Sequence, residues 1–92
     1  MLTNQLVEKL ECALACAQVQ NITLMATLLD EVRDGSYDIM PRQSAFLMRA
    51  ACAAVEHVAS AFDALSSAQT ARSAIQQAKE AALLGGSDLN AA

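Results

Sequence analysis

The amino-acid sequence predicts an all-α protein, a small antiparallel bundle of three to four helices. Two observations predict this fold. Apolar residues recur at the three-and-four spacing of a helix face, and alanine, the best helix former, is spread along the same segments. Residues 42–84 contain neither proline nor glycine, and Gly85 and Gly86 follow them as a stop signal. We therefore expect residues 1–84 to form a single helical domain and residues 85–92 a flexible C-terminal tail.

The first third of the chain predicts two helices that separate near residues 18–21. Thr3 or Asn4 is suited to cap the first helix and Asn21 the second, because their side-chain oxygens accept hydrogen bonds from free N–H groups. The apolar faces comprise Leu6, Leu10, Ala13, Leu14 and Ala17 in the first helix, and Leu24, Met25, Leu28, Leu29 and Val32 in the second. The alternative interpretation is a single unbroken helix over residues 4–33.

The second helix is expected to end at Gly35, which is suited to the left-handed conformation that follows many helices. Ser36 to Asp38 then form a loop. Ile39 and Met40 are apolar and are expected to pack this loop onto the bundle. Proline disfavours helix in the residue before it and is favoured at the first helical position, so the next helix should begin at Pro41.

The third helix is predicted to run from Pro41 to about Leu65. Its predicted buried residues are Leu47, Ala50, Ala51, Ala54, Val55, Val58, Ala61, Phe62 and Leu65. We place a break at Ser66 and Ser67, because serine competes with the helix for backbone hydrogen bonds. A fourth helix follows, with a narrow apolar seam of Ala68, Ala71, Ile75, Ala78 and Ala82 that suits close helix contact. An unbroken helix over residues 41–84 is the alternative.

The charge balance is mildly acidic, with six Lys and Arg against ten Asp and Glu and a net charge of −4. Because no run of Lys or Arg occurs, a surface that follows nucleic-acid phosphates is disfavoured. The N-terminus lacks the basic flank of a signal peptide, and no apolar run approaches the ~20 residues of a membrane span. The sequence therefore predicts a cytoplasmic protein with no membrane association.

The three cysteines and the single histidine are the residues with most chemical potential. Cys12 and Cys16 lie one helical turn apart, and Cys52 precedes Glu56 and His57, so a helix-borne metal site can be imagined. The short loop spacing typical of zinc sites is missing, and buried thiols pack well among alanines. No nucleophile, phosphate loop or paired-carboxylate motif accompanies the histidine. We expect structural cysteines, no metal, no cofactor and no enzymatic activity.

The leading hypothesis is therefore a non-enzymatic protein–protein interaction module that binds an unidentified partner through helical surfaces. Adaptors, chaperones and phage or bacterial inhibitors include small acidic helical bundles, which is an analogy of size and composition only. One alternative is a small DNA-associated regulator of helix-turn-helix type that uses Arg42 and Arg49. A second alternative is a metal or redox sensor that uses Cys12 and Cys16.

A charge pattern predicts self-association. Arg42, Arg49, Glu56 and Asp63 are spaced by sevens and so fall along one face of the predicted third helix. Their order opposes the helix dipole, which favours acids at the N-terminus and bases at the C-terminus. In an antiparallel copy of the same helix, each arginine would face an acid of the other chain. The pattern predicts a two-fold homodimer that crosses near Cys52.

The predicted self-association face comprises Arg42, Phe46, Arg49, Cys52, Ala53, Glu56 and Asp63. The alternative is that its charges are simply solvated, or pair within one chain with Glu8, Glu11 or Lys79. A dimer that does not use this face is expected to use the alanine seam over residues 68–82.

Overall fold

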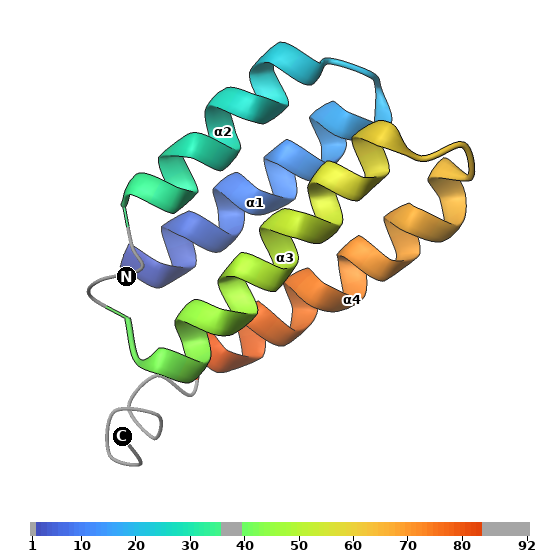
Figure 1. The fold of residues 1–92 in the computed structure, drawn as a ribbon. Helices are drawn as coiled ribbons and strands as arrows, with labels where there is room; N and C mark the ends of the chain where they lie inside the picture. The colour runs from blue at the N-terminus through green and yellow to red at the C-terminus, as the bar shows by residue number, and fades with distance from the viewer. Residues whose placement is uncertain (1, 36–39, 84–92) are drawn as a thin grey trace.

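The computed structural model describes residues 2–35 and 40–83, which form four α-helices and no strand (Figure 1). The helices are α1 (Leu2–Gln18), α2 (Ile22–Asp34), α3 (Arg42–Ser60) and α4 (Ala64–Leu83). Successive helices run in opposite directions along one long axis. The predicted all-α bundle is confirmed, with four helices. The predicted tail at residues 85–92 lies outside the described residues.

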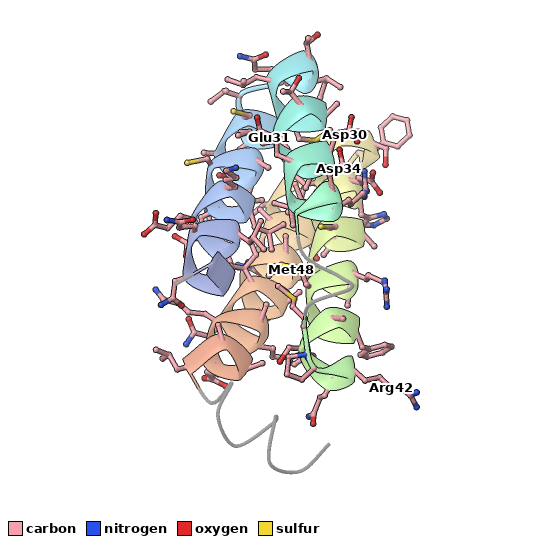
Figure 2. All side chains as sticks on the ribbon, turned by 90° about the vertical axis from the view of Figure 1, so that its left-hand side faces the viewer. Asp30, Glu31, Asp34, Arg42 and Met48 are labelled. Carbon is pink, nitrogen blue, oxygen red and sulfur yellow. The ribbon has the colours of Figure 1, made fainter. Side chains whose placement is uncertain are left out.

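Helix α1 is the element that joins the others. It contacts α2, α3 and α4, whereas α2 and α4 make no contact over their described lengths and α2 meets α3 only slightly. The α3–α4 contact is the most extensive in the bundle. The core between the helices includes the fully buried Leu10, Leu29, Val32 and Val55, together with Met48, which Figure 2 shows inside the bundle.

Two separate helices, not one, occupy residues 4–33. The first begins at Leu2, so Asn4 lies within its first turn and does not cap it. The chain leaves the first helix at Gln20, whose φ of 62° is in the left-handed region. Asn21 then caps α2 as predicted, with its Oδ1 accepting from the Leu24 N–H at 3.3 Å.

The end of α2 and the start of α3 differ slightly from the prediction. Gly35 has φ −86° and ψ −2°, so the predicted left-handed conformation is wrong. Its N–H still donates to the Glu31 carbonyl at 3.1 Å, which keeps the helical geometry for one more residue. Pro41 is extended and precedes the helix, and its carbonyl accepts from the Ala45 N–H at 2.9 Å. Met40 packs against the core as predicted, and residues 36–39 lie outside the described part of the chain.

The predicted break between the third and fourth helices exists, but it lies at residues 61–63 and not at Ser66 and Ser67. Ala61 is extended, and Asp63 accepts a hydrogen bond from the Ser66 N–H through Oδ1 at 3.1 Å. A carboxylate at this position both caps the helix and interacts favourably with its dipole. The predicted burial of Phe62 and Leu65 is therefore wrong: both side chains are exposed.

The apolar faces follow the sequence prediction most closely where large side chains define them. All five predicted residues of α1 are buried, and in α2 Met25, Leu29 and Val32 are buried while Leu24 is exposed. The predicted seam of α4 faces the core. In α3 the buried face is rotated relative to the prediction: Ala50 is exposed. The additional buried residues of α3 are Ser44, Ala45, Met48 and Cys52.

The position of the break is tested by removing its cap. Asp63→Ala leaves the Ser66 N–H without its side-chain acceptor, so we expect the free energy of unfolding to fall by about 0.5–2 kcal/mol. The control Ser66→Ala changes an exposed residue within the helix and should shift stability by less than about 0.5 kcal/mol. Urea denaturation followed by circular dichroism measures both. A larger loss for Ser66→Ala than for Asp63→Ala would contradict this boundary.

Candidate functional site

The outer face of α3 carries most of the predicted self-association residues. Arg42, Phe46, Arg49, Ala53 and Glu56 are all exposed there, and Phe46 is 66% exposed. Figure 2 shows Arg42 extending away from the bundle near the start of the helix. The sequence therefore located a solvent-facing surface correctly for these five positions.

The remaining two predicted residues lie elsewhere. Cys52 is buried, with 2% of its surface exposed, and belongs to the core. Asp63 lies beyond the end of α3 and caps α4. The predicted straight line of four charges on one helix is therefore wrong, and Cys52 is not part of the exposed face; the two-fold crossing near it stays a prediction. The cause is the break at residues 61–63, together with an alanine-rich helix in which several faces are equally apolar.

Among the residues that the structure describes, three ion pairs connect different helices. Lys9 Nζ lies 3.4 Å from Glu31 Oε2 between α1 and α2, and Lys79 Nζ lies 3.9 Å from Glu11 Oε1 between α4 and α1. The side chains of these two pairs, and of a third pair described below, are partly exposed to solvent. Each pair therefore contributes little to the free energy of unfolding.

The third pair joins Arg33 of α2 to Glu56 of α3. Arg33 also lies 3.5 Å from Asp30, on the side of α2 where Figure 2 shows Asp30, Glu31 and Asp34. Glu56 is thus paired within its own chain, and an intermolecular partner would have to compete with Arg33. This pair could not be predicted from the sequence, because its members lie 23 positions apart.

Two shallow cavities lie along the groove between α1 and α4, with volumes of about 320 and about 360 Å³. The first is lined by Glu11, Leu14, Arg72, Ile75, Gln76 and Lys79, and the second by Asn4, Val7, Glu8, Glu11, Lys79 and Leu83. Glu11 and Lys79, which pair with each other, line both. The volumes of the two cavities are at the lower limit of small-molecule sites. The residues that line the cavities combine apolar side chains with charges of both signs.

One end of the bundle is almost free of charge. Residues 12–29 contain no Asp, Glu, Lys or Arg, and residues 57–71 contain only Asp63. Since the helices alternate in direction, the α1–α2 turn and the α3–α4 turn lie at the same end (Figure 1). We call the surface formed by residues 18–24 and 60–66 the uncharged end.

The uncharged end also carries most of the exposed large apolar side chains. Within the described ranges 4–35 and 40–83, seven such side chains are exposed, and five of them belong to this end. They are Val19 at 75%, Ile22 at 44%, Leu24 at 45%, Phe62 at 111% and Leu65 at 70% exposure. A surface with clustered apolar groups and few charges resembles the centre of a protein interface.

This surface was not predicted from the sequence, because Leu24, Phe62 and Leu65 were expected to be buried in the core. The two runs without charge, residues 12–29 and 64–71, are visible in the sequence. They become one surface only because the fold brings the two turns to the same end.

The residues of the alternative hypotheses are dispersed. Cys12 is exposed on α1, Cys16 is half-buried and Cys52 is buried on α3. His57 is exposed at the surface of α3. Within the part of the chain that the structure describes, no three His, Cys, Asp or Glu side chains form a group suited to hold a metal ion.

The arrangement of α2 and α3 differs from a helix-turn-helix. In that motif the two helices are joined by a turn of 3–4 residues and pack across each other. Here residues 35–41 join them, and the two helices barely touch. Arg42 and Arg49 are exposed on α3, and their use in DNA binding stays a prediction.

No protein-family model, curated protein or solved structure matches the chain. Among the described helices, none has both the length and the apolar character required of a transmembrane segment.

The thiol positions predict an order of chemical reactivity. In the folded protein, iodoacetamide should modify exposed Cys12 fastest, half-buried Cys16 more slowly, and Cys52 only when the chain unfolds. Peptide mass spectrometry after timed labelling measures each site, and labelling in guanidinium chloride provides the control in which all three react. Rapid labelling of Cys52 in the folded protein would contradict its burial.

Proposed function

We propose that this chain is a non-enzymatic protein-interaction module that binds a partner protein through a helical surface. Its action would be steric, as in adaptors, chaperones and inhibitors that occupy part of a partner. The observation that supports this proposal is the uncharged end, where five large apolar side chains from two turns are exposed together.

The size of this surface supports binding to a protein. From the exposed fractions, the five side chains present on the order of 600 Å² of area to solvent. This total is divided between the two turns; contiguous apolar patches of about 300–600 Å² on monomers are often functional. Phe62 provides a large aromatic anchor of the kind that dominates binding energy in many interfaces.

The outer face of α3 is the weaker candidate for this role. Phe46 is its one large exposed apolar residue, and its neighbours along the helix include Arg42, Arg49 and Glu56. Charged residues are depleted from the centres of protein interfaces. A partner would also have to accommodate the ion pair between Arg33 and Glu56 at the edge of this face.

Affinity capture with surface variants tests the proposal. The tagged chain is used as bait in cells that express it, and captured proteins are identified by mass spectrometry. Phe62→Ser with Leu65→Ser should reduce recovery of the partner at least about tenfold, since it removes about half of the exposed apolar area. The control Phe46→Ser removes an exposed aromatic residue from α3 and should leave recovery unchanged.

The candidate partner is then purified and titrated calorimetrically with the three proteins. Direct binding that the double variant weakens and Phe46→Ser does not would support the proposal. Binding that depends on Phe46 and ignores Phe62 and Leu65 would assign the function to α3 instead. Conversion of the partner or of a small molecule by the purified chain would contradict a non-enzymatic role.

A further inference from the structure

We propose that the uncharged end binds a second copy of this chain, which gives a two-fold homodimer joined end to end. The proposal rests on the same surface as the proposed function and names an occupant for it. In this arrangement the turns at residues 18–24 and 60–66 of one chain pack against the same turns of the other. Such an interface is isologous, because each chain contributes the same residues.

Charge is the first reason to choose a second copy. Each chain carries a net charge of −4, so most contacts between two copies bring acidic residues together. At the uncharged end, Glu11, Asp30 and Arg72 are the nearest charged residues on α1, α2 and α4. At a rise of 1.5 Å per residue, they lie about 10–12 Å along the helices from the turns.

That separation is close to the Debye length of about 8–10 Å at physiological ionic strength, so repulsion between copies is largely screened there. Asp63 is the one charged residue within the uncharged end. Its carboxylate accepts a hydrogen bond from the Ser66 N–H at the start of α4. On α3 the nearest acid is Glu56, which Arg33 neutralises. Two copies can therefore meet at this end with Asp63 as the one acidic residue of each chain within the contact, where the N-terminus of α4 favours its negative charge.

The available area is the second reason. If each copy covers about 600 Å² of apolar side chain, the dimer buries about 1,200 Å² in total. This is the lower limit of specific, stable interfaces, so we expect a reversible dimer with a dissociation constant in the micromolar range.

A second copy also fits this surface better than a membrane does. Residues 18–24 and 60–66 contain no Lys or Arg to bind anionic headgroups, and no Trp or Tyr to lie at the headgroup level. A basic protein surface would find only Asp63 to pair with here. The same end of another copy matches the surface in its apolar character and in its low content of charged residues.

Sedimentation equilibrium of the purified full-length protein tests the proposal, over protein concentrations from about 1 to about 200 µM. We expect a reversible monomer–dimer equilibrium. Raising NaCl from about 50 to about 500 mM should leave it unchanged or strengthen it, because apolar contacts are not screened. Phe62→Ser with Leu65→Ser should weaken association at least about tenfold.

A second double variant, Val19→Ser with Ile22→Ser, changes the other turn and should weaken association similarly. The matched control Phe46→Ser should change the dissociation constant by less than about twofold, since that residue lies outside the interface. Circular dichroism of each variant confirms that the helices are retained. Because only purified protein is used, failure to capture a partner protein would leave this result unaffected.

Three outcomes would overturn the proposal. The first is a protein that stays monomeric at every concentration. If this monomer also sediments with phosphatidylcholine vesicles, the uncharged end would be assigned to lipid binding instead. The second is a dimer that Phe46→Ser weakens and the variants of the two turns do not, which would return self-association to α3. The third is a dimer that dissociates as salt rises, which would require an interface built on ion pairs.

Discussion

The packing of α1 against all three other helices is the contact on which this bundle depends. Without it, α2 would have only a slight contact with α3 and none with α4 over their described lengths. Leu10 and Ala13 of α1 are fully buried, and Val7 is 2% exposed, so the helix is covered from several sides. Burial of such side chains contributes far more than the partly exposed ion pairs that join the same helices.

This arrangement also determines where the two short turns lie. Each turn is fixed locally by one side-chain cap, Asn21 for α2 and Asp63 for α4. Packing of α1 against α3 and α4 then brings both turns to one end of the bundle (Figure 1). The residues of the interhelical ion pairs lie outside these two turns. The exposed apolar residues of the uncharged end are the basis for the proposed interaction.

Much of the fold could be predicted because caps and large apolar side chains are local signals. Asn21 identified the start of α2, and the leucines of α1 identified its buried face. The faces of α3 could not be assigned in the same way, because alanine lies on nearly every side of that helix. Ala50 and Ala51 are chemically identical, yet one is exposed and the other is fully buried. The break between α3 and α4 was predicted too far along the chain, because Ser66 and Ser67 indicate a helix end. The carboxylate of Asp63 is the stronger cap, and it determines where α4 begins.

The candidate site was harder to predict, since it depends on residues that are distant in the sequence. Phe46 and its charged neighbours were identified as an exposed surface, but pairing between Arg33 and Glu56 follows only from the tertiary fold. The uncharged end combines two turns that lie about forty positions apart in the sequence. The two uncharged runs can therefore be recognised as one surface only when the directions of the helices are known.

The most direct measurement of the uncharged end as a binding surface is a pair of ¹H–¹⁵N correlation spectra at low and high protein concentration. Self-association through this end should shift the amide signals of residues 18–24 and 60–66. Signals from the outer face of α3, residues 42–57, should remain in place. Shifts confined to α3, or spectra that do not change with concentration, would contradict this assignment.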